Sequence, residues 1–305
     1  MKKLLYIIYL LLSFTSAQTL EIKIIHNIQN EIITNVDIQN EYKYLLVLNN
    51  KLEELDQNKK LSISNDSIIK EKIKKIELLK FFKKLELNTQ YEDILLKNIY
   101  QRQGLNSLAE FEQYLKNYDL TLNYFKKKII IDAMWNNLIA QKYSSQIVIN
   151  KKKINEKIMN SDNDKKKEYH LSEILFEIKN KAEIKKKYNE IIKNINEKGF
   201  ENTAAIYSFA ESSKIGGDIG WINEGSLNAE IKKKIINLKI GEISSPIILS
   251  NGILILKIKD SKSITIKTDY KLELKKAIEY EQNRQLNQFS KIYFNKITKN
   301  LELNE

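Results

Sequence analysis

YSFAESSKIGGDIGWINEGSLNAEI, residues 207–231, holds four of the eight glycines in a chain of 305 residues. Glycine adopts positive φ and lets backbones approach closely without a steric penalty. We therefore expect Gly216, Gly217 and Gly220 to turn the chain tightly between a loop and a strand. Asp218 is expected to accept backbone N–H groups that hold this turn, which leaves room for Trp221 to pack.

The segments on both sides of this stretch predict a small α/β domain at 169–262. YHLSEILFEI opens it with strand character, and KAEIKKKYNEIIKNINEKG follows as an amphipathic helix that Gly199 ends. After the glycine turn come a helix around 228–237 and the strand GILILKIKD. The order is one strand, three helices and one strand, so we expect the two terminal strands to lie side by side.

Residues 18–165 show a different, mainly helical pattern. Alternation from Leu20 to Ile33 predicts two short strands and a turn, after which Thr34 or Asn35 caps a helix. The charged segment NSDNDKKKE separates this half from the α/β domain at 160–168. Apolar residues spaced by three and four predict further helices at about 66–86, 90–103, 107–117 and 121–144.

The end of the chain carries one long helical pattern, from Asp269 to about Thr298. An apolar stripe on this helix needs a partner, and it is formed by Leu286, Phe289, Tyr293 and Ile297. Packing on the N-terminal helices, dimerisation and binding to a membrane surface all satisfy that requirement.

Composition excludes several classes of function. The net charge is +12, but only Arg102 and Arg284 are arginine, and lysine lacks the bidentate fork that phosphate and base recognition favour. Lysine runs are therefore interpreted as solvated helix faces, with no nucleic-acid partner. The absence of cysteine excludes disulfides, a thiol nucleophile and cysteine metal sites. We expect no cofactor and no metal.

The first seventeen residues have the pattern of a secretory signal. Lys2 and Lys3 precede an apolar run from Leu4 to Phe14, and small residues ending at Ala17 follow. The run is about half of the roughly 20 residues that a membrane-spanning helix needs. We expect cleavage of residues 1–17 and no stable membrane insertion afterwards, with a retained membrane anchor as the alternative.

Two resemblances follow from these motifs. ILFEI, AAIYS, GGDIGWINEG, LKIGEISSPI and NGILILKI resemble, in order and spacing, the parvulin (PpiC or rotamase) domain of peptidyl-prolyl isomerases. KIIHNIQNEIITNVDIQNEYKYL resembles the opening of SurA-type periplasmic chaperones. Together they imply an α+β fold. A helical SurA-like chaperone domain at 18–165 would be completed by the C-terminal helix at 268–300, with a single parvulin-like α/β domain inserted at 169–262.

The resemblance also assigns candidate site residues. In the parvulin family the glycine turn forms one side of the substrate groove, although the same turn is equally expected as a scaffold. The polar family positions are occupied here by Glu173, Ala210 and Leu254, where the family has histidine, cysteine or aspartate, and histidine respectively. Glu173 and Asn251 are the groups left that can polarise a bound amide. The apolar groove is expected from Ile219, Leu227, Ile231, Leu249 and Leu254.

Neither histidine of the chain occupies a family position. His170 stands three residues before Glu173, and an odd offset in a strand points it to the opposite face, so we interpret it as a surface residue. His26 lies in the N-terminal strands.

Two functions follow. The first is a periplasmic chaperone that binds unfolded outer-membrane protein segments, with a parvulin-like domain of weak or no isomerase activity. The second is an active parvulin-type prolyl isomerase, and a membrane-anchored foldase is a third if the signal segment is retained. The side chains at 173, 210 and 254 favour the first.

Overall fold

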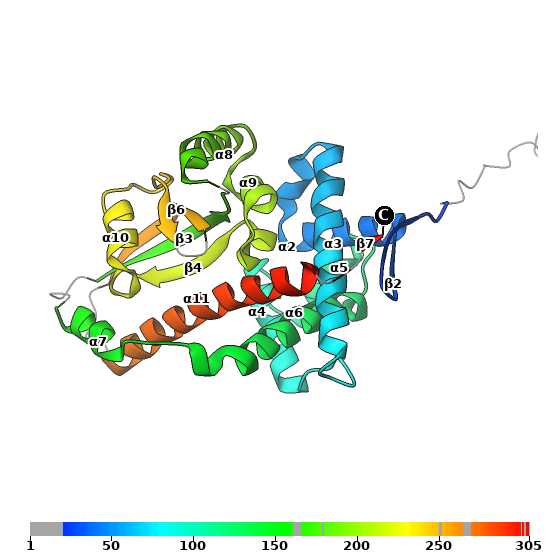
Figure 1. Cartoon of the computed structure of the whole chain (residues 1–305), viewed down its shortest axis with the longest axis horizontal. Helices are drawn as coiled ribbons and strands as arrows, with labels where there is room; N and C mark the ends of the chain where they lie inside the picture. Colours follow the sequence, from blue (N-terminus) through cyan, green and yellow to red (C-terminus); the bar gives the residue numbers. More distant parts are fainter. Residues whose placement is uncertain are drawn as a thin grey trace, which may run out of the picture.

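The computed structural model describes residues 21–160, 166–178, 180–249, 252–264, 270–299, 301 and 303–304. The predicted signal segment and Asn251 lie outside these residues. The described chain forms a helical domain, an α/β domain and a long C-terminal helix that runs along both (Figure 1).

The helical domain begins with a hairpin and continues through helices that local signals define. Thr34 caps α2 in a capping box with Asp37, as one of the two expected caps. Helix α3 starts nine residues earlier than predicted, because Asp56 caps it by accepting a hydrogen bond from the Lys59 N–H at 3.0 Å. The elements are β1 (Ile24–Ile28), β2 (Glu31–Thr34), α2 (Asn35–Leu48), α3 (Gln57–Leu79), α4 (Thr89–Arg102), α5 (Leu108–Lys116), α6 (Leu122–Tyr143) and α7 (Lys151–Asn160), with 3-10 turns η1 (Asn50–Glu54) and η2 (Ser144–Gln146).

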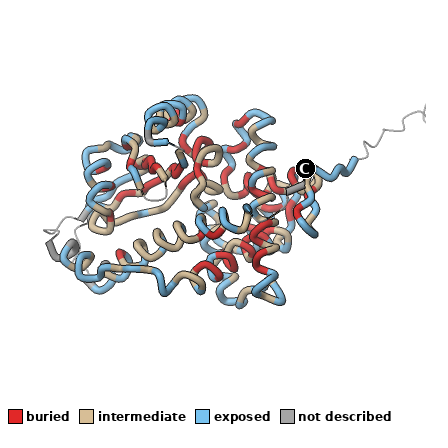
Figure 2. The backbone as a smooth tube through the Cα atoms, in the orientation of Figure 1, coloured by how far each residue is buried: buried red, intermediate tan, exposed pale blue. Residues whose placement is uncertain are grey.

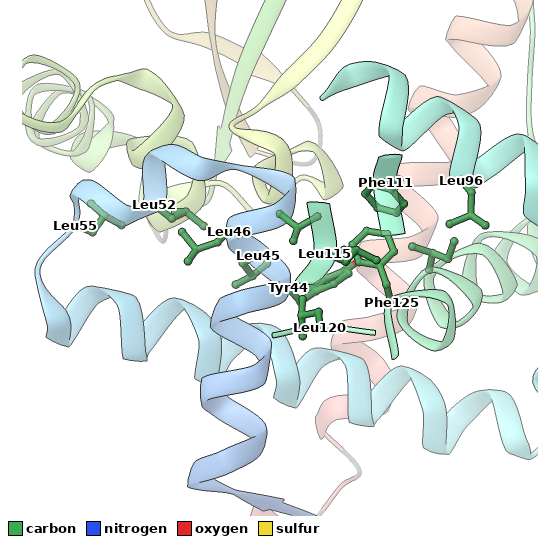
Figure 3. Packing of buried hydrophobic residues seen from close by; sticks show 12 residues of the cluster. Tyr44, Leu45, Leu46, Leu52, Leu55, Leu96, Phe111, Leu115, Leu120 and Phe125 are labelled. Carbon is green, nitrogen blue, oxygen red and sulfur yellow. The ribbon is translucent and has the colours of Figure 1, made fainter. Parts of the chain in front are cut away.

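The core of this domain is aromatic and aliphatic. Figure 3 shows Tyr44, Phe111 and Phe125 gathered among buried leucines, with the Tyr44–Phe125 and Phe111–Phe125 ring centroids each 5.1 Å apart. The buried segments concentrate where α2, α3 and α6 face one another (Figure 2). The predicted helices at 90–103, 107–117 and 121–144 are confirmed to within a residue or so at each end.

The α/β domain is a four-stranded antiparallel sheet with helices packed on it. Strands β3 (Lys166–Phe176) and β6 (Gly252–Ile264) are central neighbours, which confirms that the terminal strands pair. The separating segment is shorter than predicted, because β3 already begins at Lys166. The other elements are η3 (Lys181–Glu183), α8 (Ile184–Lys198), α9 (Phe200–Tyr207), η4 (Glu211–Ile215), β4 (Asp218–Asn223), η5 (Glu224–Ser226), α10 (Ala229–Ile235) and β5 (Ile247–Leu249).

The sheet order is β4-β3-β6-β5, and β5 was not predicted. Gly199 ends α8 at φ 82°, as expected. One hydrophobic cluster on each face of the sheet closes the domain, and both clusters contain only residues of this domain.

The C-terminal helix α11 (Tyr270–Lys299) packs on the helical domain, which confirms the fold class inferred from the sequence. Tyr293 stacks on the fully buried Trp135 with ring centroids 5.7 Å apart, and the Trp135 indole N–H donates to the Ser290 hydroxyl at 2.8 Å. Strand β7 (Leu303–Asn304) then pairs with β1. The apolar stripe therefore finds its partner within the chain.

Candidate functional site

The glycine turn lies directly against strand β3. Gly216, Gly217 and Gly220 have φ of 69°, 80° and 73°, as the sequence predicted. The Glu173 N–H donates to the Gly217 carbonyl at 2.8 Å, and the Asp218 carboxylate accepts from the Gly220 N–H at 2.7 Å. A Cβ at Gly217 would lie 2.3 Å from the Glu173 carbonyl oxygen, so this position requires glycine for space as well as for φ.

Replacing Gly217 with alanine is therefore expected to destabilise the α/β domain much more than the same change at Gly220. Left-handed φ alone costs an alanine about 1–2 kcal/mol, and Gly217→Ala adds a backbone collision of about 1–3 kcal/mol. A Cβ at Gly220 meets nothing within 4 Å, so Gly220→Ala is the matched control. Urea unfolding of the two variants measures the difference, and equal losses would contradict the close approach.

His170 and Trp221 lie on the sheet face opposite Glu173, as the strand offset predicted for His170. The His170 ring Nε2 lies 2.9 Å from the Asp218 Oδ1, and its ring stacks on Trp221 with centroids 5.3 Å apart. His170 is more covered than the surface residue expected, with 25% of its side chain exposed, because Asp218 and Trp221 lie against it. Trp221 packs on the His170 ring and stays 39% exposed.

A cavity of about 250 Å³ lies between the α/β domain, the helical domain and α11. It brings together five residues that the resemblance singled out: Glu173, Ala210, Ile231, Leu249 and Leu254. Leu227 and Ile219 do not line it but pack in the adjoining hydrophobic cluster. The sequence thus predicted the wall that the α/β domain forms, but not the walls formed by the helical domain and α11.

Glu173 is the one predicted polar group that reaches this cavity among the described residues. It accepts a hydrogen bond from the Ser212 hydroxyl at 2.9 Å. Burial raises the pKa of the Glu173 carboxyl, although the Ser212 hydrogen bond opposes the shift. The partner Ser212 was not predicted. Its position two residues after Ala210 is the only sequence signal that pointed to it.

Helix α11 supplies the opposite wall, which no local pattern in the sequence indicated. Its Lys291 ammonium lies 3.0 Å from the centroid of the Phe209 ring and forms an ion pair with Glu177. Tyr280 faces the same cavity, and burial raises its pKa to about 12, with the Glu173 charge adding to the shift. Side chains of α11 thus cover the candidate groove.

Four charged residues join the two domains beside the cavity. Lys74 on α3 contacts Asp132 on α6 at 3.0 Å and Glu211 on η4 at 2.9 Å. Lys214 on η4 contacts the other oxygen of Asp132 at 2.8 Å. The two lysines hold the pKa of the Asp132 carboxyl well below its usual range, although burial opposes this shift. The network fixes the glycine-rich loop against the helical domain.

The described residues contain no cluster of three or more side chains suited to a metal ion. Within the same part of the chain, none of the helices combines the length and the apolarity needed to cross a membrane.

Comparison with known proteins assigns the α/β domain. Residues 170–260 match the family model of the rotamase, or PPIC-type PPIASE, domain. These residues form a parvulin-type domain. The matched family is that of peptidyl-prolyl isomerase domains, and the parvulin domain supplies one wall of the cavity described above.

The chain is homologous to SurA chaperones and PrsA foldases over part of its length. It is 25% identical to the foldase protein PrsA 2 of Bacillus anthracis over 223 residues, which cover 73% of this chain and 63% of the relative. It is 25% identical to the chaperone SurA of Pseudomonas putida over 174 residues, 54% of this chain and 40% of the relative. The matches thus span less than two thirds of each relative.

Two solved structures align with most of the chain at low identity. PrsA from Bacillus subtilis covers 91% of this chain at 20% identity, with 92% of its own chain matched and a TM-score of 0.28. A SurA-like chaperone of Campylobacter jejuni covers 93% of this chain at 16% identity, with 100% of its own chain matched and a TM-score of 0.29.

Proposed function

We propose that this protein is a periplasmic chaperone that binds unfolded polypeptide segments, including outer-membrane protein precursors, and isomerises prolyl bonds only weakly. One observation carries the proposal: the parvulin cavity keeps an apolar surface at Ile231, Leu249 and Leu254, while two of the three polar family positions that line it are occupied by Ala210 and Leu254. Homology to chaperones named SurA supports unfolded polypeptides as the clients. The same homology, together with the signal-like residues 1–17, supports the periplasm as the compartment.

Apolar groups on the helical domain support client binding. Large apolar side chains stay exposed on α3, α4, α5 and the segment after α3, namely Leu61, Leu79, Phe81, Tyr91, Ile94 and Leu108. An extended client segment has apolar and aromatic side chains that can bind to them.

The proposed weakness of the isomerase follows from the groups around the cavity. Rotation of an X-Pro bond crosses a barrier of about 18–20 kcal/mol, and positioned polar groups lower such barriers by stabilising the twisted amide. Ala210 and Leu254 have no polar atoms to offer, and Leu254 is 4% exposed. Desolvation of the amide against Ile231, Leu249 and Leu254 still lowers the rotation barrier.

An active isomerase is the second candidate, and Glu173 is the observation that favours it. Its raised pKa means that the protonated carboxyl persists to higher pH than usual. A protonated carboxyl donates a hydrogen bond, so Glu173 can polarise a prolyl amide as a neutral acid. Ser212 holds the carboxyl in place for this role.

Two assays on one sample test the proposal. Exchange spectroscopy on an Ala-Pro peptide should give cis/trans rates near background, while aggregation of an unfolded β-barrel protein should be suppressed. The double variant Glu173→His/Leu254→His restores the family side chains, and it should raise the exchange rate by about tenfold or more because each positioned polar group contributes strongly. Wild-type turnover comparable to that of an active parvulin would instead support the isomerase. Unsuppressed aggregation would contradict the chaperone.

A further inference from the structure

Lys291 of α11 reaches into the parvulin cavity and contacts two residues of the parvulin domain. It comes from α11, yet its ammonium lies over the Phe209 ring and pairs with Glu177, both on the parvulin domain. Only 14% of the Lys291 side chain is exposed. Burial lowers the pKa of the Lys291 ammonium even though Glu177 opposes that shift, so the lysine is held there at a desolvation cost. The Lys291 ammonium thus lies between an aromatic ring and a carboxylate of the parvulin domain.

The parvulin side of this place is built along strand β3 and the residue that follows its end. Glu173 and Leu175 lie on the same face of β3, and Glu177 follows two positions further along the chain. The Phe209 N–H donates to the Leu175 carbonyl at 2.9 Å, which sets the ring beside this row. Two carboxylates and an aromatic face thus line one end of the cavity.

The charges at the Phe209 end of the cavity favour a cation as the ligand. Of the other basic side chains that line the cavity, Lys74 and Lys214 are paired with Asp132 and Arg284 is paired with Glu281, whereas Lys70 lies on the helical-domain wall. Among the residues that the structure describes, the Glu173 carboxylate accepts a side-chain hydrogen bond from Ser212 alone, and no cation of these residues lies within ion-pair distance of it. The Glu177 carboxylate at this end would repel an acidic ligand side chain.

We propose that Phe209, Glu177 and Glu173 form a subsite for an arginine or lysine side chain of a client segment, and that Lys291 occupies it in the absence of client. The inference rests on the proposed function, because it assumes that client segments enter this cavity. An apolar side chain of the client next to its arginine or lysine would then contact Ile231, Leu249 and Leu254 of this protein. Guanidinium is more weakly hydrated than ammonium and stacks on aromatic faces, so arginine binds better than lysine.

Labelled Ala-Pro peptides that differ only in the residue before alanine, as arginine, lysine, glutamine or glutamate, test the subsite. Fluorescence anisotropy at physiological ionic strength should rank them arginine, lysine, glutamine, glutamate. Contact of a cation with an aromatic ring and a carboxylate should make the affinity of the arginine peptide about tenfold higher than that of the glutamine peptide. The variant Lys291→Met removes the internal competitor and should tighten binding of the arginine peptide about threefold to tenfold.

Matched variants separate the subsite from the net charge of the protein. Lys296→Met removes an exposed lysine of the same helix that does not line the cavity, and it should leave the arginine peptide affinity unchanged. Glu177→Gln and Phe209→Leu should each reduce the preference for arginine while the glutamine peptide binds as before. Thermal unfolding of every variant confirms that it is folded.

The outcomes are distinguishable. Equal affinities for all four peptides in the wild type and in Lys291→Met would overturn the cation subsite and leave peptide binding intact. Equal tightening by Lys291→Met and Lys296→Met would also overturn it, because the effect would then come from net charge. Failure of every peptide to bind either protein would overturn the proposed binding function of the cavity itself.

Discussion

A chain ended after Ser263 is expected to lose the fold of its helical domain while the parvulin domain stays folded. Tyr293 of α11 stacks on Trp135, and Phe289 stacks on Tyr143. Phe294 packs against α6 and against a second buried cluster, formed by Ile28, Ile33, Ile38, Ile68 and Ile73. Burial of such side chains contributes about 1.5–3 kcal/mol each. Loss of several equals much of a domain's net stability of about 5–15 kcal/mol.

The parvulin domain should survive because its two hydrophobic clusters contain no residue of α11. Two-dimensional NMR and limited proteolysis of the truncated chain distinguish the two domains. A fully folded helical domain in that chain would contradict the insertion model. A milder variant, Tyr293→Ala, should cost about 3–5 kcal/mol, and Lys296→Ala on the exposed side of α11 should cost less than about 0.5 kcal/mol.

Local signals in the sequence predicted most of the fold. Thr34 and Gly199 mark helix ends through groups within a few residues, so their roles can be inferred without knowledge of the tertiary structure. The early start of α3 was missed because residues 57–65 are mostly polar, and only the cap at Asp56 indicated a helix there. Patterns of apolar spacing give no information where a helix start is polar.

The candidate site was predicted less completely, for a physical reason. The resemblance located Glu173, Ala210 and Leu254 on one wall of the cavity. The opposite wall depends on contacts between distant parts of the chain, such as Lys74 with Glu211, which are 137 positions apart. Long-range ion pairs leave no periodic signal in a sequence, so the cover by α11 and the role of Lys291 became apparent only in three dimensions.

Replacing Asp132 with asparagine is expected to weaken the joint between the domains most strongly among single charge changes. The substitution leaves Lys214 without its carboxylate and leaves Lys74 with Glu211 alone. Loss of one partner of a buried ion pair typically costs about 3–5 kcal/mol. We expect the lower end, because 23% of the Lys214 side chain is exposed. Glu211 is 43% exposed, so solvent screens its contact with Lys74, and the equivalent change there should have a smaller effect.

The matched control is Asp119→Asn, which removes a pair with Lys43 at a position 83% exposed and should leave the urea unfolding midpoint unchanged. Equal midpoints for Asp132→Asn and Asp119→Asn would contradict the role of the network.

The same network predicts how stability depends on pH. Asp132 has a lowered pKa in the folded protein, so its contribution is fully present above the ordinary aspartate pKa of about 4. It is lost as the pH falls through the depressed pKa of the folded state. Lys214 has a raised pKa, so its contribution is present below about 10.5 and is lost at higher pH. Wild type and Asp132→Asn should therefore differ most between about pH 5 and 9 and converge in acid, where the carboxylate is protonated in both folded and unfolded chains. A difference that stayed constant down to pH 1 would show that the asparagine acts through packing and not through the lost charge.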